Sequence, residues 1–119
     1  MAKLPKPEKT LIKFIERCWM PKRFDRAVKY IQRTWAHENR NTIESRLNSM
    51  FVHIDVIEYG IKEVIPVTKV VKDIVFWIKL GDGTIRTLKA RLICEKYPYK
   101  PTIHGKWGIN PPSITRGLY

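Results

Sequence analysis

The chain has 119 residues, of which 23 are Lys or Arg and 11 are Asp or Glu, so its formal net charge is +12 at pH 7. A hydrophobic content of 44% excludes a disordered chain, and the length suits a single domain, 1–119, with a core of its own. No apolar run has the length of a secretory signal or a membrane span, and Cys18 and Cys94 lie in apolar patterns, so we expect a soluble, intracellular (cytoplasmic) protein with reduced thiols.

The first half of the chain has the apolar spacing of amphipathic helices, and we expect helices over about residues 8–50. The first helix ends at Met20 and Pro21. Its apolar positions recur every three or four residues: Leu11, Ile12, Ile15, Cys18 and Trp19. Its cations occupy another face: Lys6, Lys9, Lys13 and Arg17. An anionic membrane surface is one alternative partner for this helix, although its apolar stripe is needed to cover a core.

Two further helices are expected before the chain changes character. Pro21 suits the first turn of a second helix. The apolar stripe of that helix contains Phe24, Ala27, Val28, Ile31 and Trp35. Asn41 followed by Glu44 resembles a capping box, which predicts a short third helix over the apolar positions Ile43, Leu47 and Met50.

From Phe51 the apolar period changes to two, which predicts a sheet over about residues 51–110. The first strand ends at Gly60, and its inward face contains Val52, Ile54 and Val56. Pro66 has no N–H to donate, so a strand within residues 61–72 lies at an edge or carries a bulge. A last short strand is expected at 105–109, followed by a Pro-rich tail at 111–119 that packs on the domain or is held by a partner.

A hairpin around Gly81, Asp82 and Gly83 is the clearest element. A three-residue loop with Gly83 left-handed separates apolar from charged side chains better than a two-residue turn. Its register pairs Ile78 with Arg86, Phe76 with Leu88 and Ile74 with Ala90. The inward face is then Ile74, Phe76, Ile78, Leu88, Ala90 and Leu92. The opposite face is Val75, Trp77, Lys79, Thr87, Lys89 and Arg91, with Asp73 across from Arg91.

Residues 74–95 read IVFWIKLGDGTIRTLKARLICE, and residues 105–111 read GKWGINP. Together with the three helices before them, they resemble the nuclear transport factor 2-like superfamily over roughly residues 10–112. The resemblance implies an α+β fold in which N-terminal helices pack on a curved antiparallel sheet, cone-like and cystatin-type, often dimeric through the sheet. Members include isomerases, dehydratases, secretion-system subunits, transport adaptors and ribosome-anchoring proteins, so the resemblance does not select a function.

Four cations on the second helix are the first candidate site. They recur at helical spacing with little acid among them: Lys22, Arg26, Lys29 and Arg33. Such a flank can follow a phosphate backbone, because each cation that meets a phosphate releases a counterion. The alternative is a solvated helix face.

A second candidate lies on the outward face of the hairpin. Trp77 stands beside Lys89 and Arg91, and an aromatic ring among cations can stack a base of single-stranded RNA or DNA. The alternative is that Trp77 covers a homodimer or partner interface. Three aromatics near the end of the chain are either a docking arm or packed on the body: Tyr97, Tyr99 and Trp107.

Catalytic and metal chemistry have weak signals. His53 and Asp55, near Tyr59, are expected on one strand face and are the only candidates for proton transfer, although that face points outward. The residues with metal-ligating side chains are scattered: Cys18, His37, His53, Cys94 and His104. The chain has no Gly-rich phosphate loop or nucleophile elbow, so we expect no cofactor and no metal.

We therefore expect a non-catalytic basic adaptor or accessory protein that binds nucleic acid or a nucleoprotein complex largely independently of sequence. One alternative is a small-ligand binder or an enzyme of the isomerase or dehydratase type that uses the cone cavity. The other is a structural subunit of a larger assembly. A cavity filled by Phe76, Ile78, Leu88 and Leu92 would argue against the ligand-binding alternative.

Overall fold

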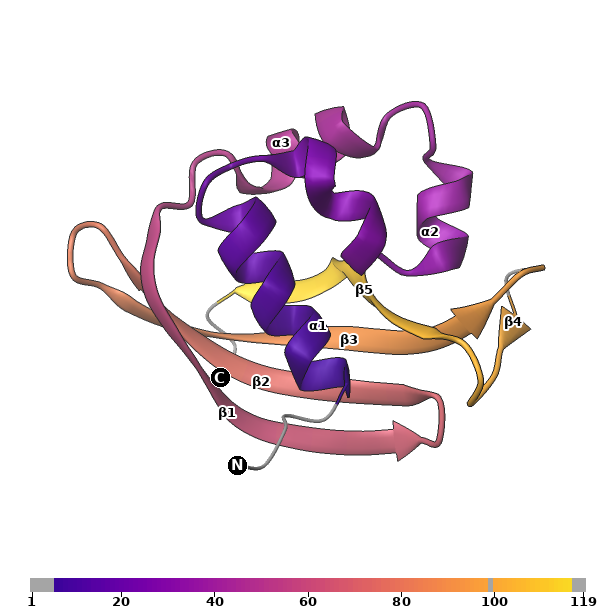
Figure 1. The fold of residues 1–119 in the computed structure, drawn as a ribbon. Coiled ribbons are helices and arrows are strands. Elements are labelled where there is room, and N and C mark those ends of the chain that lie inside the picture. The colour runs from indigo at the N-terminus through magenta and orange to yellow at the C-terminus, as the bar shows by residue number, and fades with distance from the viewer. Residues whose placement is uncertain (1–5, 99, 117–119) are drawn as a thin grey trace.

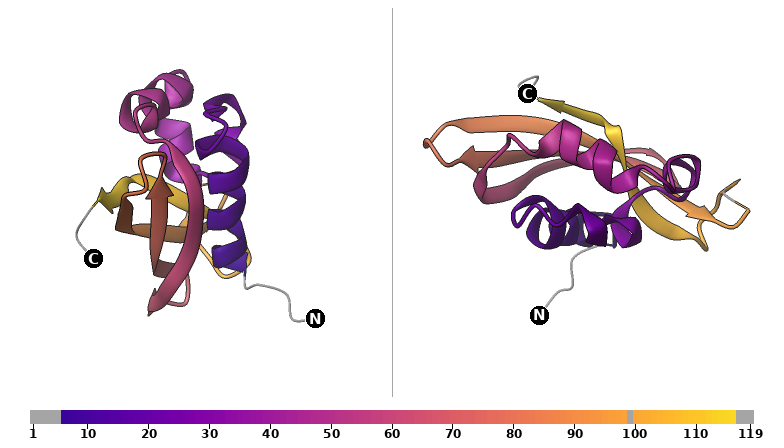
Figure 2. Two further views of the ribbon diagram at one scale, coloured as in Figure 1. Left: turned by 90° about the vertical axis from the view of Figure 1, so that its left-hand side faces the viewer. Right: turned by 90° about the horizontal axis from the view of Figure 1, so that it is seen from above.

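A computed structural model describes residues 6–98 and 100–116 of the chain. Helices are followed by an antiparallel sheet, and the helices lie on one face of it (Figure 1). This is the expected α+β class. Further views show the strands twisting and curving past the helices without closing on themselves (Figure 2). Among the described residues, no helix combines the length and the apolar character that crossing a bilayer requires.

The helical half contains α1 (Lys6–Phe14), a π-helical turn η1 (Ile15–Trp19), a 3-10 helix η2 (Phe24–Tyr30), α2 (Arg33–Glu38) and α3 (Ile43–Phe51). The prediction of one continuous second helix after Pro21 is therefore wrong. Residues 31 and 32 interrupt it, because Ile31 is extended and bridges Ile109 while the Gln32 N–H donates to the Ile109 carbonyl (2.8 Å). The capping box is also wrong, because the residue that precedes α3 is Thr42 and its side chain makes no cap hydrogen bond.

The sheet contains β1 (Val56–Thr68), β2 (Val71–Leu80), β3 (Ile85–Lys96), β4 (Lys100–Pro101) and β5 (Lys106–Arg116). The order is β1-β2-β3, and both β4 and β5 pair with the far side of β3. The first strand begins at Val56 rather than at Phe51 and continues past Gly60 to Thr68. As Pro66 predicts, β1 is an edge strand, and its register shifts beside that residue.

The hairpin register is confirmed. In the pairing of β2 with β3, Ile78 faces Arg86, Phe76 faces Leu88 and Asp73 faces Arg91. The loop residue Gly83 has φ +90°, the left-handed backbone that favours glycine. The six inward residues of the predicted register all belong to the core, each with 1% or less of its surface exposed.

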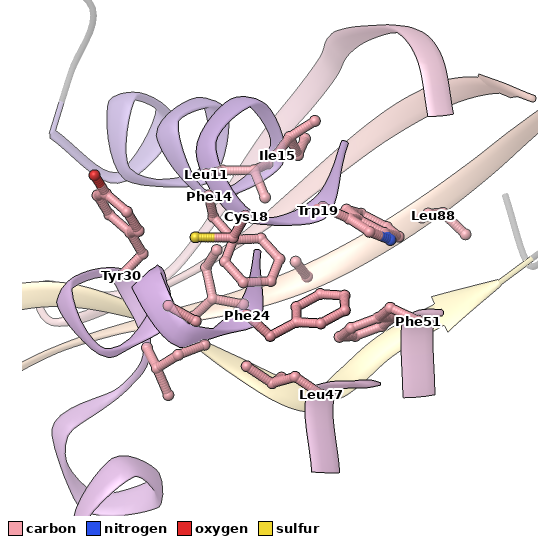
Figure 3. Close-up of a cluster of buried hydrophobic side chains, with 14 of the residues drawn as sticks. Leu11, Phe14, Ile15, Cys18, Trp19, Phe24, Tyr30, Leu47, Phe51 and Leu88 are labelled. Atoms are coloured by element: carbon pink, nitrogen blue, oxygen red, sulfur yellow. The ribbon is translucent and has the colours of Figure 1, made fainter. Parts of the chain in front are cut away.

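Aromatic side chains fill the space between helices and sheet (Figure 3). Trp19 from η1 lies at the centre, with ring centroids 5.1 Å from Phe51, 6.1 Å from Phe14 and 6.1 Å from Phe76. Burying rings of this size contributes a large share of the hydrophobic stabilisation. The two cysteines are buried and unbridged, as expected, and burial raises the pKa of Cys18 to about 11.

The end of the chain belongs to the sheet. β5 runs to Arg116, so residues 111–116 are strand rather than a Pro-rich tail, while 117–119 lie outside the described residues. Two contacts join this end of the sheet to the helices. The buried Glu95 accepts hydrogen bonds from the Thr34 backbone N–H (3.0 Å) and hydroxyl (2.8 Å), and the Asn110 amide donates to Gln32 Oε1 (2.7 Å).

Candidate nucleic-acid interface

The four cations predicted for one helical flank are divided among three segments. Lys22 lies in the turn before η2, where its ammonium group pairs with the Asp55 carboxylate. Arg33 begins α2, and its Nη2 donates to the Lys29 carbonyl (2.9 Å). Arg26 and Lys29 remain exposed on η2, where a spacing of three places them on one face. The single continuous stripe is therefore wrong, and two of its four members stay together at the surface.

Those two cations adjoin a larger basic cluster that involves α1 and β5. A pocket of about 270 Å³ is bordered by Thr10, Tyr30, Gly105, Trp107 and five lysines, which are Lys6, Lys9 and Lys13 of α1, Lys29 of η2 and Lys106 of β5. We call it the lysine pocket. Its described lining contains no Asp or Glu. Positive potential from three elements therefore converges on one hollow.

The helical segment formed by α1 and η1 carries its cations on one flank. Lys6, Lys9 and Lys13 of α1 and Arg17 of η1 follow that flank, whereas Glu8 and Glu16 lie off it. One hydrogen bond fixes the direction of Arg17 and another that of Glu16. Arg17 Nη1 donates to the Tyr30 hydroxyl on η2 (3.0 Å), and the Tyr59 hydroxyl on β1 donates to Glu16 Oε2 (2.6 Å). The cationic flank therefore faces η2 and β5, and Glu16 faces β1.

A second hollow extends the basic region along η2. It is bordered by Arg17, Asp25, Arg26, Val28, Lys29 and Tyr30, and it shares Lys29 and Tyr30 with the lysine pocket. Its one described carboxylate belongs to Asp25, which Arg23 engages at 3.3 Å through two nitrogens. This hydrogen bonding lowers the pKa of Asp25. We call the combined set the basic surface: Lys6, Lys9, Lys13, Arg17, Arg26, Lys29 and Lys106.

The second predicted site lies on the other face of the sheet. Trp77 alternates with the core residues Phe76 and Ile78 and therefore points away from the helices. Arg91 is on that face too, but its Nε and Nη2 bind the two oxygens of the buried Asp73 carboxylate at 2.8 and 3.1 Å. This bonding raises the pKa of Arg91. The predicted set of Trp77, Lys89 and Arg91 thus shares a face, and the guanidinium of Arg91 is bound to a buried carboxylate.

The proposed proton-transfer pair does not lie on a strand. His53 and Asp55 are in the connection between α3 and β1, so the premise of a shared strand face is wrong. Asp55 pairs with Lys22, while His53 borders a hollow with Ile54, Ile78, Leu80 and Arg86. Within residues 6–98 and 100–116, no three His, Cys, Asp or Glu side chains gather in a way that could hold a metal ion.

Sequence reasoning recognised the cationic flank of the first helix and considered an anionic membrane surface as its partner, but did not assign it to the nucleic-acid site. The signal was the spacing of Lys6, Lys9, Lys13 and Arg17, which puts four cations on one side of a helix. Lys106 gives no such signal, because it reaches the cluster only through the pairing of β5 with β3 and with residues 31 and 32.

Comparisons of the chain with protein-family models, curated proteins and solved structures find no match. The resemblance to the nuclear transport factor 2-like superfamily therefore stays a prediction. Helices on one face of a curved antiparallel sheet agree with that resemblance at the level of the α+β class.

Proposed function

We propose that this domain binds nucleic acid through its basic surface, without catalysing a reaction. The observation that carries the proposal is the lysine pocket, where five lysines from three elements border one hollow without a carboxylate among the described lining residues. Cations held together in this way repel one another in the free protein. A phosphate backbone removes that repulsion and releases its counterions to solution.

The dimensions of the basic surface suit an extended polyanion. From Lys6 to Lys13 the cationic flank of α1 is about 10 Å long, at about 1.5 Å per residue, and Arg17 of η1 extends it by about one further turn. Lysine ammonium groups recognise phosphates rather than base edges, so binding is largely independent of sequence. A nucleic-acid partner and two buried, unbridged thiols agree with an intracellular site of action.

Reversing two charges on α1 tests the proposal. With five phosphate contacts, the slope of log K against log salt is about −3.5 on single strands, and Lys9→Glu with Lys13→Glu should reduce it to about −2.1. The matched control is Lys62→Glu with Lys69→Glu, which changes the net charge equally at two exposed positions of the β1 end of the sheet. Fluorescence anisotropy of a labelled oligonucleotide, repeated at several salt concentrations, measures the slope for each of the two variants.

Equal losses of oligonucleotide affinity in the two variants would contradict the proposal, because binding would then depend only on net charge. Polyglutamate as a competitor separates nucleic acid from an acidic protein partner. If polyglutamate of matched charge displaces the oligonucleotide at equal concentration, the surface recognises anionic polymers in general. That result would favour the structural-subunit alternative.

The small-ligand alternative has less support. The positions expected to line a cone cavity are Phe76, Ile78, Leu88 and Leu92, and each has 1% or less of its surface exposed within the core. Homodimerisation through the outward face around Trp77 is compatible with nucleic-acid binding at the basic surface, because the two occupy opposite faces of the sheet.

A further inference from the structure

The lysine pocket contains aromatic rings as well as cations. Trp107 of β5 and Tyr30 of η2 both border it. Trp107 pairs with Cys94 and is two residues from the core residue Ile109, so its side chain is on the helix side of the sheet. It is partly buried and borders the pocket. A tryptophan bordered by five lysines is a different chemical environment from a purely cationic patch.

The backbone around Trp107 is held closely on both sides. A Cβ on Gly108 would lie 2.5 Å from the Gln32 nitrogen and the Ile31 oxygen, and a Cβ on Gly105 would collide with the Glu95 backbone. Both glycines therefore let β5 approach neighbouring backbone more closely than another residue allows. Lys72 Nζ lies 5.7 Å from the centroid of the Trp107 ring, within cation–π range. The indole is thus positioned before any ligand arrives, which lowers the ordering cost of binding.

We propose that the lysine pocket takes one unpaired nucleotide of a single strand, with its base against Trp107 and its neighbouring phosphates on the lysines of α1, η2 and β5. The inference rests on the proposed function and specifies its substrate class. Bases in a duplex are paired and stacked on one another, so only a single strand can present a base to the indole. The volume of about 270 Å³ lies just below the usual range of ligand pockets, about 300–1,000 Å³, so the pocket has room for no more than one nucleotide.

Trp107 is better placed for this role than Trp77, the ring that the sequence singled out. On the outward face the guanidinium of Arg91 is bound to Asp73, whereas the described lining of the lysine pocket offers five lysines and no carboxylate. Phosphates that flank a stacked base therefore find more cations around Trp107.

Leucine substitutions at the two tryptophans test the inference. The probes are a labelled oligo(dT) strand and a labelled duplex, each at one fixed salt concentration. Trp107→Leu should weaken oligo(dT) binding by about 5- to 150-fold, the range for losing one stacked base, and leave duplex affinity within about twofold. Trp77→Leu is the matched control and should change neither. Trp107→Phe keeps a ring and should recover most of the oligo(dT) affinity.

Tryptophan emission gives a second readout that does not depend on how well the leucine variant folds. Oligo(dT) should quench the emission of the wild-type protein, and Trp107→Phe should remove most of that quenching. The inference is overturned if Trp107→Leu binds oligo(dT) as tightly as the wild type does, or if Trp77→Leu is the variant that loses oligo(dT) affinity. Should both probes bind and respond to Lys9→Glu with Lys13→Glu but not to Trp107→Leu, the proposed function stands without the nucleotide pocket. If neither probe binds, both the proposed function and the nucleotide pocket are contradicted.

Discussion

Tyr59 joins the edge strand β1 to Glu16 of η1. Its hydroxyl donates to Glu16 Oε2 at 2.6 Å. Burial, followed by this hydrogen bond, raises the pKa of Tyr59 to about 12 from its usual value of 10.0. Between these two values the folded protein keeps a proton that the unfolded chain loses. The stabilisation from Tyr59 is therefore complete below about pH 10 and is lost as the pH rises towards 12.

We predict that Tyr59→Phe lowers the free energy of unfolding by about 1 kcal/mol at pH 8, because Glu16 loses its donor. The deficit should shrink as the pH rises from 10 towards 12, where the wild type loses the same bond. Urea unfolding of both proteins at pH 8 and pH 11 measures the difference, and subtraction removes the titration of the lysines that both share. A deficit that stays constant across this range would show that Tyr59 does not keep its proton.

Single residues also show what alternation along a strand can predict. Asp73 and Arg91 were expected across from one another, and they form a two-point ion pair. The same pair engages one cation of the set predicted around Trp77. Sequence places Arg91 beside Trp77 but does not show that its guanidinium is already bound to a buried carboxylate.

At the scale of elements, local rules predicted the hairpin and failed for the second helix. Strand alternation and a glycine at positive φ fix the register of β2 and β3, and both can be read from adjacent residues. The apolar spacing from Phe24 to Trp35 fits a continuous α-helix as well as the alternation in β2 and β3 fits strands. The competing contact is distant in sequence, since Ile31 is held extended by its bridge to Ile109.

Proline placed strands correctly in one case and not in the other. Pro66 was expected to mark an edge strand, and β1 is one. The prolines predict the end of the sheet at 111, yet Pro111 and Pro112 lie inside β5. They fall at its register shift, because the pairing with β3 passes from Asn110 to Thr115 while β3 advances from Arg91 to Lys89. A proline lacks only its own donor, so an irregular stretch of a strand can contain it. Here proline marks an edge strand in β1 and an irregularity in β5, not the end of the sheet.

The close approach of β5 to residues 31 and 32 depends on Gly108. We predict that Gly108→Ala lowers the free energy of unfolding by about 1–3 kcal/mol, because the added methyl group would lie 2.5 Å from two backbone atoms that cannot move independently. Gly81→Ala is the control, since its Cβ would have 3.8 Å to the nearest atom, Asp55 Cβ. Chemical unfolding measures both. Equal stability of the two variants would mean that β5 does not press on this segment.

At the scale of the molecule, the basic surface exists only because distant segments meet. Six of its cations lie within residues 6–29, and the seventh is Lys106. Most of the sheet lies between them in the sequence, so only the folded chain brings them together. Net charge predicted a polyanion partner but not the place where it binds. The described lining of the lysine pocket contains no carboxylate, and Glu16 of η1 is held by Tyr59 of β1.

Because its cations are clustered, we expect added salt to stabilise the free protein. We expect the same salt to weaken the stabilisation that bound nucleic acid provides. The molecule measures 42 × 35 × 29 Å, so at about 0.01 M salt, where the Debye length is about 30 Å, most of its charges repel one another. At about 0.15 M that length is about 8 Å. We predict that the melting temperature of the free protein rises by a few degrees, about 4 °C per kcal/mol, over this range. Saturating oligo(dT) should raise it further at low salt than at high salt, because bound ligand stabilises in proportion to the logarithm of its affinity.

The charge-reversal variants locate the repulsion that causes this rise. Lys9→Glu with Lys13→Glu and Lys62→Glu with Lys69→Glu lower the net charge equally, but only the first pair lies in the lysine pocket. If repulsion is concentrated there, the first variant should have the flattest melting profile against salt, and the second should lie between it and the wild type. Differential scanning fluorimetry across the salt series measures all three. Identical profiles for the two variants would show that the cations act through net charge alone, and the case for a localised phosphate site would lose its physical basis.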